Sequence, residues 1–201
     1  MHVSMTRLPA APSFRAQRVL AAINAQIEAA VRQGVRVVHY SVQHDHLHLL
    51  VEADDNGKLA RGMQRLFSRI AFAVNRVAMR SGSLFRDRHH RHELKTPTEV
   101  RSALVYVLFN PRKHDAASAS AILGHLDWLE PYSSTMWFTD WDPRARPPPE
   151  LVTRARGSAT SSPLSAPRTW LARTGWKRAG GPLRFGESPT PYRTRPAIRV
   201  R

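Results

Sequence analysis

The sequence predicts an α+β fold, with its elements in the order β-α-β-β-α-β and one more helix after the last strand. Two observations predict it. Short segments rich in β-branched residues alternate apolar with polar positions, which is typical of half-buried strands. Between them lie longer segments in which apolar residues recur every three or four positions, as in amphipathic helices. This order fits one antiparallel sheet with two helices on one face, the ferredoxin-like arrangement, with the last helix left over.

The N-terminal quarter of the chain supplies three strands and one helix. Residues 2–7 can form a short first strand, and Ser13 is a suitable N-cap for a helix that Gly34 ends. The apolar stripe of this helix would consist of Phe14, Val19, Leu20, Ile23, Ile27 and Val31. Residues 35–42 and 46–53 both have strand composition, and the short polar link between them predicts a hairpin.

A long helix, a polar strand and a capped helix follow. Apolar residues at helical spacing predict a helix over residues 58–80, which a Ser-Gly-Ser segment ends. Residues 84–94 are expected to be extended, although they are unusually polar. The next helix has a strong start signal, with Thr96 as N-cap, Pro97 in the first turn and Glu99 completing a capping box.

The composition changes at about residue 143. Residues 143–201 hold ten prolines, and 13 Arg and Lys against two Glu. Such a segment has too few large apolar side chains to build a core of its own. We therefore expect one domain over residues 1–142, followed by a basic, Pro-rich and largely flexible tail over residues 143–201.

The charge balance points to a polyanionic partner. The chain has 31 Lys and Arg against 15 Asp and Glu, a formal net charge of +16, and clustered cations of this kind favour nucleic acid. The alternative is a protein that is merely basic. The absence of cysteine excludes disulfides, thiolate nucleophiles and Cys-based zinc sites. No apolar run is long enough to span a membrane and no signal peptide is evident, so we expect a cytoplasmic protein.

Two histidines on one predicted strand form a candidate metal site. Side chains alternate along a strand, so His46 and His48 point to one face while Leu47 and Leu49 point to the core. Two imidazoles on one face can chelate a divalent ion. The alternative is a pair of solvated histidines, because a bare His-x-His sequence is common.

A tyrosine and an asparagine on the last predicted helix form a second candidate. Tyr106 lies off the apolar stripe of this helix, and Asn110 follows one turn later on the same polar flank. A phenol and an amide oxygen there could serve as nucleophile and third metal ligand. The alternative is a structural tyrosine that is half-buried and hydrogen-bonded.

Basic residues on and around the predicted helices could contact the phosphates of a nucleic acid. Rows of this kind are often only a solvated helix face, but here they are expected to converge on the histidines and the tyrosine. The candidates are Arg61, Arg65, Arg69, Arg86, Arg88, Arg91, Lys95, Arg112 and Lys113.

In order and spacing, these motifs resemble the single-tyrosine HUH transposases, and among them the REP-associated tyrosine transposases. The resemblance runs from about His2 to Trp141 and covers the His46-Leu47-His48 strand, Gly82-Ser83-Leu84-Phe85-x-x-Arg88 and Tyr106-x-x-x-Asn110-Pro111. It implies an HUH endonuclease fold, with His46, His48 and Asn110 as ligands of Mg²⁺ or Mn²⁺ and Tyr106 as nucleophile. The implied substrate is single-stranded or hairpin DNA, cleaved through a 5′-phosphotyrosine intermediate by a monomer or a homodimer.

Three alternatives remain beside this hypothesis. A domesticated relative could bind hairpin DNA without cutting it. An RRM-like binding module would need stacking aromatic residues on its middle strands, where this chain has histidines. A hydrolase that activates water at a metal would need a carboxylate cluster, which the sequence does not show. Tyr40, Tyr132 and Tyr192 are alternative nucleophiles.

Overall fold

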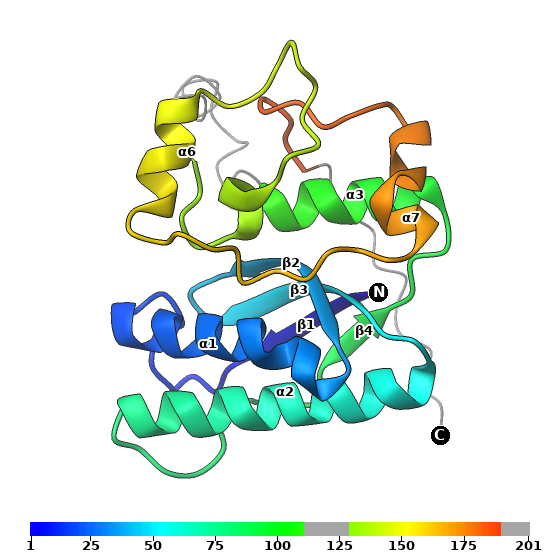
Figure 1. Cartoon of the computed structure of the whole chain (residues 1–201). Helices are drawn as coiled ribbons and strands as arrows, with labels where there is room; N and C mark the ends of the chain where they lie inside the picture. The colour runs from blue at the N-terminus through cyan, green and yellow to red at the C-terminus, as the bar shows by residue number, and fades with distance from the viewer. Residues whose placement is uncertain (111–128, 190–201) are drawn as a thin grey trace.

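The computed structural model of the chain describes residues 1–110 and 129–189 (Figure 1). In the first of these ranges, the predicted order of strands and helices is confirmed. The elements are β1 (His2–Thr6), α1 (Gln17–Ala29), β2 (Arg36–Val42), β3 (His46–Glu52), α2 (Asn56–Val77), β4 (His90–His92) and α3 (Pro97–Leu108). A 3₁₀ turn, η1, over Ala30–Gln33 extends α1.

The fold is α+β, built on one four-stranded antiparallel sheet. The strand order is β2-β3-β1-β4, and each neighbouring pair is antiparallel. The strand β3 lies in the middle, where His48 is opposite Ser4 of β1 and Ser41 of β2. The hairpin between β2 and β3 is closed by a hydrogen bond from the Gln43 amide to the His46 carbonyl.

The two long helices cover one face of the sheet (Figure 1). They bury its apolar side chains in a first core, because alternate residues of each strand point toward them. This core includes Val3 and Met5 of β1, Leu47 and Leu49 of β3, Ile23 and Ile27 of α1, and Leu66 and Ile70 of α2. Within the described residues, no helix is both long and apolar enough to span a membrane.

The structure shifts two boundaries that the sequence suggested. Ser13 does not cap α1, which begins four residues later, because the Ser13 hydroxyl is paired with His44 Nδ1 at 2.9 Å. Val31 is half-exposed, because the chain tightens into η1 before Gly34 reverses it with a φ of 83°. Of the expected extended segment 84–94, only the three residues of β4 pair as a strand.

Residues 143–189 are not the flexible tail that their composition suggested. They form α6 (Pro149–Arg156), α7 (Trp170–Arg173) and the 3₁₀ turn η3 (Gly175–Arg178), which lie with α3 over the second face of the sheet (Figure 1). The physical reason is that a few large side chains suffice when another element supplies the rest of the core. Trp176, Leu183 and Phe185 are buried in a second core together with α3 residues such as Leu104 and Leu108.

Polar contacts tie this C-terminal layer to the sheet and to α3. The Glu52 carboxylate at the end of β3 accepts hydrogen bonds from the amides of Arg168 and Thr169, at 2.7 and 3.2 Å. Arg101 of α3 makes a two-pronged ion pair with Glu187, at 2.9 and 2.7 Å. The layer therefore has a defined place on the fold.

Candidate functional site

The sheet face toward α3 is rich in histidine. Residues directly opposite one another in an antiparallel pair point to the same face, so the register assigns each side chain to a face. Six of the ten histidines of the chain fall on this one: His2, His39, His46, His48, His90 and His92. This is the face that carries the proposed metal ligands.

His46 and His48 lie side by side, with ring centroids 4.6 Å apart. The Nδ1 atom of each ring is already engaged. His46 Nδ1 is 2.6 Å from a carboxylate oxygen of Asp45, and His48 Nδ1 is 3.2 Å from Nε2 of His2. A metal-binding histidine commonly has its second nitrogen held in this way, which leaves Nε2 for the ion.

The partners of the two histidines differ in charge. Partial burial opposes ionisation of Asp45, but the hydrogen bond and charge of His46, together with Arg7, outweigh it, and the pKa of Asp45 is lowered. Burial lowers the pKa of His2 to about 4, and the neighbouring N-terminus and His92 act in the same direction. Near neutral pH, His46 is therefore held by an anion and His48 by a neutral ring.

Tyr106 of α3 reaches the same place from the opposite layer. Its hydroxyl is 3.4 Å from Nε2 of His48, and its ring stands edge-on to the His48 ring with centroids 4.9 Å apart. The ring also makes an edge contact with His2, at 5.8 Å. The structure thus brings together the tyrosine and the histidine that the sequence singled out, 58 positions apart in the chain.

Asn110, just after α3, is 1% exposed. Neither atom of its side-chain amide has a hydrogen-bond partner in the structure, so it makes no hydrogen bond to His46 or His48. Within residues 1–110 and 129–189, no group of three or more His, Cys, Asp and Glu could hold a metal ion. A metal at His46 and His48 would therefore need a donor of another kind, such as an amide or a phosphate oxygen.

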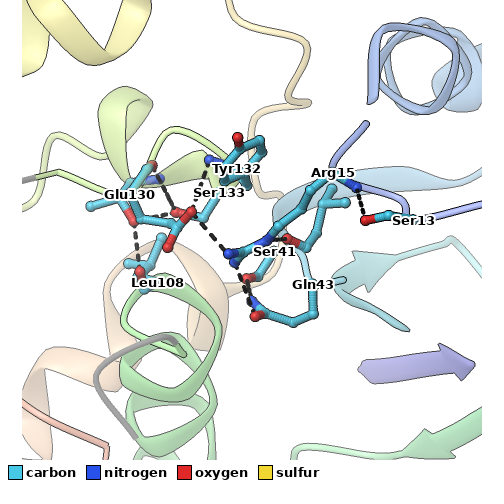
Figure 2. Close-up of polar contacts among 10 residues, drawn as sticks. Ser13, Arg15, Ser41, Gln43, Leu108, Glu130, Tyr132 and Ser133 are labelled. Atoms are coloured by element: carbon cyan, nitrogen blue, oxygen red, sulfur yellow. Dashed lines mark hydrogen bonds and ion pairs between the residues drawn. The ribbon is translucent and has the colours of Figure 1, made fainter. Parts of the chain in front are cut away.

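A polar network joins the segment before α1, the end of β2 and the segment around Glu130 (Figure 2). Arg15, just before α1, contacts a carboxylate oxygen of Glu130 at 3.5 Å and the side-chain oxygen of Gln43 at 3.0 Å. The side-chain amide of Gln43 donates to the Ser41 hydroxyl, at 2.7 Å, and Ser41 is opposite His48 in the sheet. The network thus runs from Glu130 to the strand position next to His48.

The segment that carries Glu130 also holds the end of α3. The Thr135 hydroxyl donates to the carbonyl of Leu108, the last residue of that helix, at 2.7 Å (Figure 2). Glu130 is 4% exposed, and burial raises its pKa although the charge of Arg15 opposes this. The segment that holds the end of α3 therefore contains a buried carboxylate, Glu130, whose burial is only partly offset by the charge of Arg15.

The basic residues do not all converge on the site. Because α2 packs against the face that carries Leu47 and Leu49, its exposed arginines lie on the far side of the sheet from Tyr106. These are Arg61, Arg65 and Arg69, which were predicted to contact phosphates, and Arg76. By the register, Arg91 of β4 is opposite Val3, so it is on the face that α1 and α2 cover. Arg91 is one of the exposed cations on the edge strand β4 and on either side of it in the chain. These are Arg86, Arg88, Arg91 and Lys95. Arg112 and Lys113 lie outside the described residues.

The other tyrosines are placed differently. Tyr40 is 2% exposed, and burial raises its pKa to about 12, which opposes ionisation. The Tyr132 ring lies under the guanidinium of Arg15, 4.6 Å from its centroid. Tyr192 lies outside the described residues. Tyr106 is the tyrosine that the described structure places against a histidine of the His46–His48 pair.

Sequence reasoning missed His2 and Glu130. The signal for His2 is that it shares an alternating phase with Ser4 and Thr6 on a strand, but its approach to His48 depends on the strand register. Glu130 gives no local signal, because its partner Arg15 lies 115 positions earlier in the chain.

Comparison with known proteins gives limited information. No protein-family model matches the chain, and no curated protein matches it. Among solved structures, the chain is similar to a REP-associated tyrosine transposase bound to a REP hairpin. The identity is 14%, the match covers 66% of this chain and 74% of that chain, and the TM-score is 0.49. A similarity of this size assigns neither a family nor an activity, so the chemistry of the side chains has to carry the functional conclusion.

Proposed function

We propose that this protein is a metal-dependent single-strand DNA endonuclease and strand transferase of the transposase kind, with Tyr106 as its nucleophile. The observation that carries the proposal is the contact between the Tyr106 hydroxyl and Nε2 of His48, at 3.4 Å. A phenol beside a pair of histidines on a sheet face, in a strongly basic protein, supports attack on a phosphodiester.

The donor set fits a divalent cation. His46 and His48 are neighbours on one strand face, and the second nitrogen of each is engaged, as a metal ligand requires. Asn110 would be the third ligand, and its unpartnered amide would break no hydrogen bond of the described structure to take that role. Imidazole and oxygen donors suit Mn²⁺ or Mg²⁺. The bound ion would polarise the scissile phosphate as a Lewis acid.

The side chains divide the remaining work. Asp45 holds the His46 ring in place, and α3 directs Tyr106 at the phosphate. The tyrosine oxygen forms a bond to phosphorus while the bond from phosphorus to the sugar 3′ oxygen breaks. The phenolic proton is lost to solvent, and the leaving 3′ oxygen takes a proton from solvent. The products are a 5′-phosphotyrosine and a free 3′-hydroxyl. A 3′-hydroxyl can attack the same linkage in reverse and rejoin a strand.

The fold and the charge support the same proposal. The order β2-β3-β1-β4, with α1 and α2 on one face, is compatible with a ferredoxin-like sheet. In this proposal, α3 on the other face would take the place of the additional tyrosine-bearing helix of an HUH endonuclease fold. Arg86, Arg88 and Arg91, exposed on the edge strand β4 and in the segment before it, could bind the phosphates of a single strand or hairpin.

One observation favours a second candidate, a hairpin-binding protein that does not cut. The Tyr106 hydroxyl contacts the same nitrogen of His48 that a metal ion would need. If that hydrogen bond persisted in the presence of metal, the catalytic residues would be held in an inactive pair. The basic surface would still bind DNA.

A gel assay separates the two candidates. The purified protein is incubated with a labelled single-stranded hairpin and Mn²⁺ and run under denaturing conditions. We expect a covalent protein–DNA band that disappears with EDTA and with Tyr106→Phe. Tyr132→Phe is the matched control and should keep the band. Adduct formation by Tyr106→Phe would overturn the nucleophile, and salt-sensitive binding without any adduct would support the silent binder.

A further inference from the structure

A buried histidine outside the proposed catalytic set contacts the site directly. His2 is 7% exposed, and its Nε2 atom lies 3.2 Å from Nδ1 of His48. Its ring packs against both catalytic candidates, with centroids 5.2 Å from His48 and 5.8 Å from Tyr106.

The contact between His2 and His48 has only two chemical forms when both rings are neutral. A neutral imidazole carries one N–H and one acceptor nitrogen, so either His48 donates through Nδ1 or His2 donates through Nε2. In the first form, Nε2 of His48 keeps its lone pair, accepts the Tyr106 hydroxyl and can bind a cation. In the second form, the proton sits on Nε2 of His48 and blocks a cation from that nitrogen.

The neighbouring histidine favours the first form. His46 Nδ1 faces a carboxylate, which can only accept when ionised, so His46 donates through Nδ1 and presents Nε2. If His48 is to act with His46 on one ion, it must present Nε2 as well. The Tyr106 hydroxyl, at 3.4 Å from that nitrogen, can then donate to it.

We propose that His2 is a positioning residue whose Nε2 accepts a hydrogen bond from the Nδ1–H of His48. This hydrogen bond holds the Nε2 lone pair of His48 toward Tyr106 and the metal position. This role rests on the proposed function, but its first consequence is present without metal. His2 does for His48 what Asp45 does for His46, with a neutral ring in place of a carboxylate. The two ligands are thus held by two different acceptors, His2 on β1 and Asp45 in the link between β2 and β3.

The test uses variants that remove or restore the acceptor. His2→Leu removes it, and His2→Asn leaves an amide too short to reach His48. His2→Gln can bring an amide oxygen close to the place of the lost Nε2 atom. His39→Leu is the matched control, because His39 is a half-buried histidine on the same sheet face that contacts Ser134 at 3.2 Å instead of the site.

Two readouts are measured on the full chain. The first is the tautomer of His48 in metal-free protein labelled with ¹⁵N-histidine, read from its ring nitrogen shifts. The second is Mn²⁺ affinity by titration calorimetry. We expect wild type, His2→Gln and His39→Leu to keep the Nδ1–H form of His48. We expect His2→Leu and His2→Asn to lose this single form and to bind Mn²⁺ about 10- to 100-fold more weakly.

The outcomes separate this role from the proposed function. An Nε2–H form of His48 in wild type, or an unchanged tautomer and Mn²⁺ affinity in both His2→Leu and His2→Asn, would overturn the role of His2 while leaving the tyrosine chemistry standing. The expected tautomers in a wild-type protein that binds no Mn²⁺ would uphold the positioning of His48 and overturn the metal chemistry. If His2→Leu does not fold, His2→Asn and His2→Gln still decide between these results.

Discussion

The Tyr106→Phe substitution should have opposite effects on catalysis and on metal binding. The Tyr106 hydroxyl lies 3.4 Å from Nε2 of His48, the nitrogen that an ion would occupy. An incoming ion must therefore break this hydrogen bond first. Phenylalanine removes the oxygen but keeps the ring that packs against His48 and His2. Phosphotyrosine formation should be abolished, while the ion no longer has to compete for His48.

The size of the gain follows from the geometry. A neutral hydrogen bond contributes a net 0.5 to 1.5 kcal/mol or so, and at 3.4 Å this one lies toward the lower end, about 0.5 to 1 kcal/mol. Because about 1.4 kcal/mol corresponds to a factor of ten, Tyr106→Phe should bind Mn²⁺ about two to five times more tightly than wild type.

Titration calorimetry with Mn²⁺ measures this directly, with Tyr132→Phe as the control that should leave the affinity unchanged. A weaker affinity in Tyr106→Phe would refute the reasoning, because it would mean that the hydroxyl helps to hold the ion. An unchanged affinity would show that the Tyr106–His48 contact does not compete with the metal at all.

Three further predictions concern stability and DNA contacts. Burial lowers the pKa of His39 to about 4, so its contribution to stability is complete above its ordinary pKa near 6.5. That contribution should fall by about 3 kcal/mol between pH 6.5 and 4, and urea unfolding of wild type and His39→Phe at both pH values should show this difference. Arg15→Leu leaves the buried Glu130 carboxylate without its cation and should cost about 3 kcal/mol, measured by denaturant unfolding, whereas the double change with Glu130→Gln should restore part of the loss. Replacing Arg61, Arg65 and Arg69 on the outer face of α2 together by glutamine should leave hairpin cleavage within about twofold of wild type in the gel assay. The reason is that a lost phosphate contact matters only where the DNA strand lies. A loss of cleavage would instead place the DNA on α2.

Much of the fold could be predicted from local signals. The capping box of α3 is present as expected, with the Thr96 hydroxyl accepting from the Glu99 amide and the Glu99 carboxylate accepting from the Thr96 amide. The alternation along β3 correctly separates Leu47 and Leu49 from the histidines, because strand periodicity needs no knowledge of the partner strands.

The C-terminal layer could not be predicted, because its apolar residues are buried against another element and not against one another alone. Trp176 and Leu183 lie in a segment rich in proline and arginine, so the average composition of the segment gives no sign of them. They are buried because α3 presents an apolar surface against which they pack. Composition describes what a segment can bury alone, not what it can help another segment to bury.

Some features of the candidate site could likewise be predicted from local patterns, and others could not. The spacing of His46 and His48 and the polar phase of Tyr106 are local patterns, so the sequence could propose them. The approach of Tyr106 to His48, the acceptor role of His2 and the place of the α2 arginines depend on strand register and on which helix covers which face. These are properties of the folded layers and leave no signal in a short stretch of sequence.

The exposure of side chains along β3 changes from one end of the strand to the other, and this gradient has a consequence for access. His46 is partly exposed, whereas His48 and Leu50, farther along the same face, are buried. Leu50 packs with α3 in the second core, so α3 covers the sheet at that end of β3 and the face is more accessible at the His46 end. Under the proposed function, a nucleic acid strand would enter from the His46 end, and only a phosphate that projects inward could reach the tyrosine.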